Sequence, residues 1–259
     1  MRPRTCRNYF SLRSLKLCVA LIACASPSLA SSTDNVVVRQ NVSQPDREEL
    51  AQRLRTITGW TSLNFNSDGA LAIGDSSLRG GSKAARDLLA KTLSGKRVIL
   101  LEDASSRKDV VFCRVVTGKL DRVPVAEVYV VLIDFADFRQ VSGDKQARAA
   151  FDVGWAVLHE IDHVVEDSED PKADIPGDCE AHINRMRREL GLPVRNSYFF
   201  SYLPVKNAGN VISRFVRLGF EDESDRSSKK KRYWLLWDAA LVGGVASDAE
   251  SSRASFDIF

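Results

Sequence analysis

Residues His159–His163 read H-E-x-x-H within a stretch whose apolar residues recur at helical spacing. Two histidines four residues apart lie on one face of an α-helix, so the imidazoles of His159 and His163 can bind one ion together. Glu160 projects from an adjacent strip, where its carboxylate can accept a proton from a water molecule on that ion. Zinc suits this set, because a catalytic zinc takes three protein ligands and leaves a fourth position to water. The motif therefore predicts a Zn²⁺ site with Glu160 as general base.

A third ligand is expected on a second helix, which we predict for residues 176–190 because a glycine and a proline follow it. Glu180 and Asn184 lie four residues apart beside the apolar stripe of this helix. With the upstream motif, this arrangement resembles the gluzincin branch of the zincin metallopeptidases over residues 157–190. The resemblance implies that Glu180 is the third zinc ligand and that Asn184 supports a ligand histidine. It also implies a peptide or protein substrate.

Three further polar residues on or after the second helix compete for roles in such a site. His182 lies on the opposite flank of the apolar stripe from Glu180 and is the alternative third ligand, or else a surface histidine. Asp178 reads as a helix-start residue. A gluzincin stabilises the oxyanion of its transition state, commonly with a tyrosine or a histidine, and Tyr198 and His182 are the candidates for that role.

Asp162 departs from the zincin pattern, whose motif usually carries uncharged residues between the histidines. The form H-E-x-D-H resembles peptide deformylases, which are amide hydrolases with an upstream cysteine as third ligand. Cys113 is the cysteine that could take that place, but its surroundings lack the glycine-rich segment of that family. Cys113 and Cys179 are also the two cysteines beyond residue 30, and either form a disulfide or stay separate buried thiols.

Residues 1–30 have the pattern of an export signal, with five basic residues before a short apolar stretch. The apolar run at 17–25 is too short to span a bilayer, and small residues at 28–30 offer a cleavage site. We therefore expect a periplasmic or extracellular mature chain that starts at Ser31 and has no transmembrane segment. Residues 21–24 resemble a lipobox, so lipid anchoring through Cys24 is the alternative.

The charge balance gives no support to nucleic-acid binding. Five of the 37 basic residues and none of the 34 acidic residues lie in the predicted signal, so the remaining chain carries 32 against 34. Its net charge is then about −2 with neutral histidines. The basic run at 229–232 stands across a short turn from the acidic run at 221–223, and we interpret the two as a charge-paired hairpin tip.

The remaining pattern predicts an α+β fold in a single zincin-like domain at residues 45–259, after a flexible leader at 31–44. A mixed or antiparallel sheet should pack on the motif helix and on the following ligand helix. We predict helices at 45–58, 82–93 and 145–166, a hairpin at 63–73, strands at 97–101, 110–116 and 127–135, and a late hairpin of 211–221 with 232–238. In zincins an edge strand beside the motif helix holds an extended substrate, and residues 127–135 are the candidate.

These observations lead to an exported zinc-dependent hydrolase, in the class of the metallopeptidases, as the expected function. The alternative is a non-catalytic envelope protein whose structural zinc has a fourth protein ligand, His182 or Asp178. A third alternative is a binding module in which the motif is a polar strip without metal. Zinc content and the effect of replacing Glu160 separate the three.

Overall fold

The computed structural model describes residues 35–75, 77–118, 127–170, 175–197, 200–203, 214–223 and 230–242. These all belong to the unit Thr33–Phe259, which is compact on its own. The predicted export signal, the alternative lipidation site at Cys24 and the oxyanion candidate Tyr198 lie outside the described residues. In the described parts of the chain, helices are combined with one mixed sheet and two antiparallel sheets, so the coarse prediction of an α+β fold is confirmed.

The first sheet contains four strands in the order β1 (Val36–Val38), β4 (Val98–Asp103), β6 (Val128–Ile133) and β5 (Cys113–Thr117). β1, β4 and β6 run parallel, and β5 pairs antiparallel with β6 at one edge. Two predictions need correction here. The candidate edge strand at 127–135 is an inner strand, and the edge belongs to β5. Part of the expected flexible leader is β1, because its valines pair with β4 and are buried.

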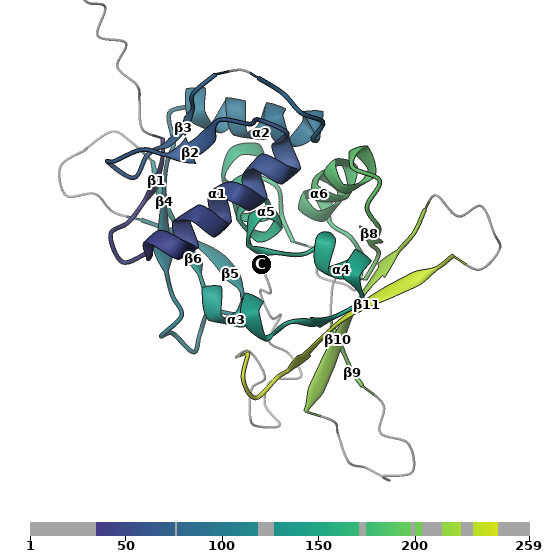
Figure 1. Ribbon diagram of the computed structural model, residues 1–259. Coiled ribbons are helices and arrows are strands. Elements are labelled where there is room, and N and C mark those ends of the chain that lie inside the picture. The colour runs from purple at the N-terminus through teal and green to yellow at the C-terminus, as the bar shows by residue number, and fades with distance from the viewer. Residues whose placement is uncertain are drawn as a thin grey trace, which may run out of the picture. The chain divides into compact units, whose positions relative to one another are not determined.

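Side chains alternate between the two faces of this sheet, as the pleat requires. One face, with Ile99, Leu101, Val131 and Ile133, joins the main hydrophobic core under the helices. The other face forms a smaller cluster around Leu100 and its neighbours on β6. The helices therefore lie against one face, as Figure 1 shows for α1 (Gln44–Thr58), α2 (Lys83–Ser94) and α5 (Val153–Glu166).

The first two helices were predicted and are confirmed, and a serine side chain caps the start of each. The side chain of Ser43 accepts the backbone N–H of Asp46 at the start of α1, and Gly59 ends the helix in the left-handed conformation. Ser82 accepts the N–H of Ala85 at the start of α2. Between the two helices lies the predicted hairpin of β2 (Leu63–Phe65) and β3 (Leu71–Ile73).

The predicted helix at 145–166 is two helices, α4 (Lys145–Ala149) and α5. The chain breaks because Phe151 packs into the core against Phe112, and because Asp152 caps α5 by accepting the N–H groups of Gly154 and Trp155. α5 is the central helix of the fold and packs against α1, α2, β5 and β6. A Cβ on Gly154 would lie 2.7 Å from Cβ of Arg53, so this glycine permits the close approach of α1.

The C-terminal part of the fold is a second sheet with two short helices beside it. Its strands are β7 (Ser142–Gly143), β8 (Val194–Arg195), β9 (Ser201–Tyr202), β10 (Phe215–Glu221) and β11 (Arg232–Asp238). The late hairpin is confirmed as the antiparallel pair of β10 and β11, which extends away from the helices in Figure 1. The predicted ligand helix is α6 (Asp178–Glu189), and a short helix α3 (Phe135–Gln140) follows β6.

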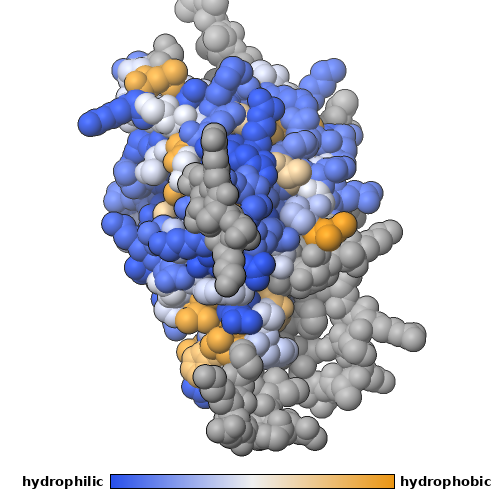
Figure 2. All heavy atoms as spheres, turned by 90° about the vertical axis from the view of Figure 1, so that its right-hand side faces the viewer, coloured by the Kyte–Doolittle hydropathy of each residue, from blue (hydrophilic) through white to orange (hydrophobic). Residues whose placement is uncertain are grey.

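No helix within the described residues is both long and apolar enough to cross a membrane. The face shown in Figure 2 is mostly hydrophilic, with hydrophobic residues in small separate groups. The sequence thus places its apolar side chains in the core around α5, and the H-E-x-x-H motif lies on that helix.

Candidate metal site

The motif lies in the last three turns of α5, and the helix buries it almost completely. His159 is 2% exposed and Glu160 0% exposed, while the side chain of His163 is 14% exposed. The helix ends at Asp167 in the left-handed conformation, which turns the following residues back toward the motif. That turn brings the loop residues Ser168 and Asp170 into contact with the two histidines.

The imidazole rings of His159 and His163 both direct their Nε2 atoms toward one position. Nε2 of His159 lies 3.2 Å from Oδ1 of Asp170, and Nε2 of His163 lies 3.3 Å from the same oxygen. The other nitrogen of each ring faces a different group. Nδ1 of His163 is 2.8 Å from the carbonyl oxygen of Ser168, and Nδ1 of His159 is 3.8 Å from Oε2 of Glu180. Both rings are therefore oriented with Nε2 toward a shared position.

The charges around this position shift the pKa values of its members in different directions. Burial lowers the pKa of His159 against the opposing effect of Asp170 and Glu180. For His163 burial also acts downward, but the hydrogen-bonding and charge of Asp170 with the charge of Glu160 outweigh it and raise the pKa to about 9. Burial raises the pKa of Asp170, but the two histidines dominate and hold it below its usual range. The site is thus rich in negative charge, which favours a cation.

Cys179, at the start of α6, is a third donor beside the two histidines. Single ligand atoms of Cys179, His159 and His163 all lie within 4.8 Å of one another. The thiol donates a hydrogen bond to the carbonyl oxygen of His159 at 3.4 Å. Burial, with the charges of Asp162 and Glu180, raises the pKa of Cys179 well above its usual value. This cysteine is therefore protonated and held as a donor to the backbone of α5.

Glu180, the predicted third ligand, is a fully buried residue held by two arginines. Its Oε1 accepts a hydrogen bond from Nη1 of Arg187, and its Oε2 lies 3.1 Å from Nη1 of Arg195. The side chains of all three are at most 3% exposed. Burial raises the pKa of Glu180, but the two arginines and His159 outweigh it and lower the pKa. Glu180 is an ionised carboxylate next to His159, and its role as ligand stays a prediction.

Asn184, predicted to support a ligand histidine, connects α6 to β8. Its Oδ1 accepts the backbone N–H of Arg195 at 2.9 Å and a hydrogen bond from Arg187 at 2.8 Å. Its Nδ2 donates to the carbonyl oxygen of Arg195 at 2.6 Å. Arg187 in turn packs over the rings of Trp155 and Phe220. Asn184 thus positions the arginines that hold Glu180, and through them the neighbourhood of His159.

Glu160 connects the motif to the edge strand β5. Its Oε2 accepts the backbone N–H of Val115 at 2.8 Å. The direction of the backbone N–H groups of β5 follows from Gly118, whose N–H points to β6 and donates to the carbonyl oxygen of Val128. By the alternation of an antiparallel strand, the N–H groups of Val115 and Thr117 point away from β6. The carboxylate of Glu160 is therefore fixed at the outer edge of β5, which pairs with no other strand among the described residues.

The aspartate inside the motif, which departs from the zincin pattern, has a structural partner on each side. Asp162 is 2% exposed, and its Oδ2 accepts a hydrogen bond from the hydroxyl of Ser168 at 2.7 Å. Nδ1 of His182 lies 3.0 Å from the same oxygen. His182 contacts Asp162 with a side chain that is 49% exposed. Asp162 therefore ties the loop after α5 and the start of α6 to the motif helix.

Cys113 and Cys179 are both buried free thiols in the structure. This is the second of the two predicted alternatives, without the disulfide. Cys113 lies on β5 beside Glu160, whose charge adds to burial in raising the pKa of its thiol. In the described residues it is Cys179 that lies with the two histidines in a group that could hold a metal ion. The geometry thus gives no support to Cys113 as a deformylase-like ligand.

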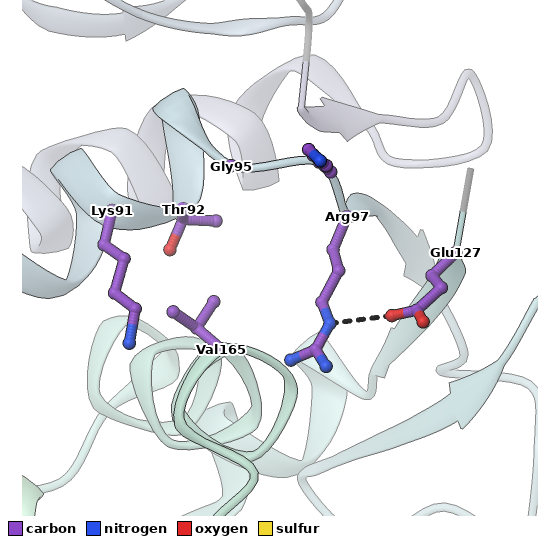
Figure 3. Close-up of a pocket in the computed structure, with 7 residues that line it drawn as sticks. Lys91, Thr92, Gly95, Arg97, Glu127 and Val165 are labelled. Atoms are coloured by element: carbon purple, nitrogen blue, oxygen red, sulfur yellow. Dashed lines mark hydrogen bonds and ion pairs between the residues drawn. The ribbon is translucent and has the colours of Figure 1, made fainter. Parts of the chain in front are cut away.

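A separate cavity of about 330 Å³ opens between the ends of α2 and α5 (Figure 3). Its basic residues are partly paired, since Arg97 bonds Glu127 at 2.8 Å and Lys91 bonds Glu166 at 2.7 Å. Val165 contributes an apolar wall from α5. Most of its lining residues belong to the end of α2 and to the segments before β4 and β6, and none of them is a residue of the histidine site.

Comparison with known proteins adds no assignment. No family model, no curated protein and no solved structure matches the chain. The candidate site therefore rests on the residues and on their geometry. The sequence singled out the two histidines, Glu160 and Glu180, but it missed Asp170, Arg187 and Arg195. Arg187 had a signal, because it follows Glu180 by seven residues and so shares its face of α6.

Proposed function

We propose that the protein is a zinc-dependent hydrolase that cleaves peptide bonds in an exported compartment. The observation that carries the proposal is the convergence of Nε2 of His159 and Nε2 of His163 on one position, beside a fixed glutamate. Both atoms lie within 3.3 Å of the same carboxylate oxygen. The zincin resemblance of residues 157–190 supports the choice of a peptide substrate, and the export-signal pattern supports the compartment.

The residues present fit a zinc ion in number and in chemistry. Imidazole nitrogens and carboxylate oxygens are typical zinc ligands, and the resemblance assigns Glu180 as the third one. Nε2 of His163 is buried and makes no hydrogen bond of good geometry within the described part of the chain. Its Nδ1 is engaged by the carbonyl of Ser168, as the second nitrogen of a metal-ligating histidine commonly is. A cation at the shared position would satisfy the buried nitrogen.

A bound zinc ion supplies an activated water by lowering its pKa toward neutrality. Glu160 then takes the proton of the attacking water and delivers it to the leaving amine. The hydrogen bond from Val115 holds one oxygen of this carboxylate in place, so its orientation does not depend on the substrate. Burial of the motif excludes bulk water and strengthens the interactions of the carboxylate with the reacting atoms.

The outer edge of β5 supports an extended peptide as substrate, since no other described strand pairs with it. Thr117 presents backbone groups on the side away from β6, next to Val115, whose N–H donates to Glu160. An extended chain that adds to such an edge through main-chain hydrogen bonds would bring its carbonyl groups past the motif. The side chain of Thr117 is exposed, which leaves room beside that part of the strand.

The proposal is tested with purified mature protein, its zinc content, and hydrolysis of a peptide library. Glu160→Gln keeps the size and the acceptor for Val115, so zinc content and melting temperature should stay unchanged. Hydrolysis should fall by about 10²–10⁴-fold, which is the usual contribution of a general base. Glu166→Gln is the matched control, because Glu166 lies on the same helix and pairs with Lys91 at the surface. Equal cleavage by wild type and Glu160→Gln would refute the mechanism.

A structural zinc site is the second candidate function, and the burial of the motif favours it. His159 and Glu160 are at most 2% exposed, and Cys179 stands beside the histidines as a further donor. A structural zinc is closed by four protein ligands and contributes directly to folding. In that case chelation should unfold the protein, Glu160→Gln should be silent, and wild type should cleave no peptide of the library.

A further inference from the structure

We infer that Asp170 is a ligand of the proposed metal ion, and that Glu180 orients His159 from the far side of its ring. The inference rests on the proposed zinc site and names the carboxylate that completes it. Asp170 lies in the loop after α5, seven residues beyond His163, and had no sequence signal of its own. Its Oδ1 lies at the position that both Nε2 atoms face.

The groups that face the two nitrogens of each ring distinguish the expected metal ligand from the residues that orient the rings. A metal-ligating histidine binds the ion with one nitrogen and donates its other N–H to a carboxylate or a backbone carbonyl. His163 follows this rule with Nδ1 toward the carbonyl of Ser168 at 2.8 Å. Nδ1 of His159 faces Oε2 of Glu180 at 3.8 Å, which is an ion-pair contact longer than a hydrogen bond. The carboxylate on the Nε2 side of both rings is that of Asp170.

The partners of Glu180 point the same way. Its two oxygens are engaged by Arg187 and Arg195, whose side chains are at most 3% exposed. To bind the ion, Glu180 would have to give up at least part of these contacts and leave a guanidinium without its carboxylate in a buried place, which is costly. Asp170 would give up only its direct contacts with the two histidines, and the ion would replace them. Its side chain is 21% exposed, and its contacts are the two histidines themselves.

The chain of contacts also accounts for Asp162. The hydroxyl of Ser168 donates to Asp162 at 2.7 Å, and the carbonyl of Ser168 faces His163. Ser168 is therefore fixed twice against α5, and it lies two residues before Asp170. The loop is held where its carboxylate meets the histidines, which is the function we assign to the charged residue inside the motif.

The test compares zinc affinities, measured by competition with a chromogenic chelator. Asp170→Ala should weaken zinc binding by more than about 100-fold, because loss of an outer partner alone costs about 10–100-fold. Glu180→Gln should stay within that smaller range. Glu169→Ala is the matched control, since it removes an exposed carboxylate from the adjacent position and should bind zinc as wild type does.

A spectroscopic variant tests the contact itself and does not depend on a loss of binding. Cobalt-loaded Asp170→Cys should show a thiolate-to-cobalt charge-transfer band in the near ultraviolet, whereas cobalt-loaded Glu169→Cys should match wild type. The inference is overturned if wild type binds zinc and Asp170→Ala binds it equally well. It is also overturned if Asp170→Cys retains cobalt without the new band. If wild type binds no zinc, the proposed function fails and this inference falls with it.

Discussion

Glu180→Gln in the zinc-free protein tests whether the buried ion cluster of α6 stabilises the fold independently of any metal. The substitution keeps the shape of the side chain and removes its charge. Arg187 and Arg195 would then lose a negative partner in a place where the side chains are at most 3% exposed. The hydrogen bonds that Asn184 makes to both arginines would remain and could not replace that charge.

The magnitude follows from the burial of the three groups. Removing one partner of a buried ion pair typically costs about 3–5 kcal/mol, because an uncompensated charge stays behind. The lowered pKa of Glu180 also means that its charge stabilises the folded state, because the folded state prefers the ionised carboxylate. Stability from this group is present above the ordinary carboxylate pKa of 4.5 and is lost as the pH falls below it. We therefore expect a loss of about 3–5 kcal/mol at pH 7 and a smaller loss at pH 4.

The assay is urea unfolding in the presence of a chelator, followed by circular dichroism. Glu223→Gln is the matched control, because Glu223 pairs at 2.6 Å with Arg188 of the same helix on the surface. Exposed pairs contribute about 0–1 kcal/mol, so this variant should unfold almost as wild type does. Should Glu180→Gln lose no more stability than Glu223→Gln, the reasoning about the buried cluster would be refuted.

Three further substitutions and one pH profile probe other parts of the site and its support. Gly154→Ala should lower the melting temperature by overpacking against Arg53, although alanine is the better helix former by about 1 kcal/mol. Asp162→Ala should destabilise the fold by about 1–3 kcal/mol in urea, whereas Asp162→Asn, which keeps an acceptor for Ser168, should cost less. Burial raises the pKa of Asp137 from 3.8 to about 6, so the unfolding free energy of wild type relative to Asp137→Asn should fall as the pH rises from about 4 to 6. Cys179→Ser should change zinc affinity only a few-fold by chelator competition, and a loss beyond about 100-fold would make the cysteine a ligand.

Local sequence signals predicted the elements well where caps and periodicity agreed. α1 and α2 have serine caps and glycine ends, and both lie where the pattern placed them. The pattern failed where tertiary contacts decide the backbone. Residues 145–166 have continuous helical periodicity, yet burial of Phe151 and the cap at Asp152 divide them. The short strand β1 was missed because three valines after a polar segment give no alternation, and its pairing partner lies sixty residues away.

In the candidate site, too, the residues within one helix could be predicted from the sequence, whereas the residue placed by tertiary contacts could not. His159, Glu160 and His163 lie within one helix, so their spacing alone defines their shared face. Asp170 belongs to an irregular loop, whose position depends on the hydrogen bonds of Ser168 and on the left-handed residue Asp167. No spacing rule covers such a loop. Sequence reasoning therefore finds the helix of the candidate site and not the carboxylate beside it.

The state of Cys179 bears on whether the site is open or closed. A closed site would need four protein donors, and the cysteine could join the two histidines and a carboxylate. A thiol binds zinc as a thiolate, and burial among Asp162 and Glu180 raises the pKa of this one. The thiol also donates a hydrogen bond to the carbonyl oxygen of His159, so binding of zinc by Cys179 would break this contact with the motif helix. Ligation by Cys179 would therefore require the loss of the thiol proton, and the zinc affinity of Cys179→Ser separates a site closed by the cysteine from one without it.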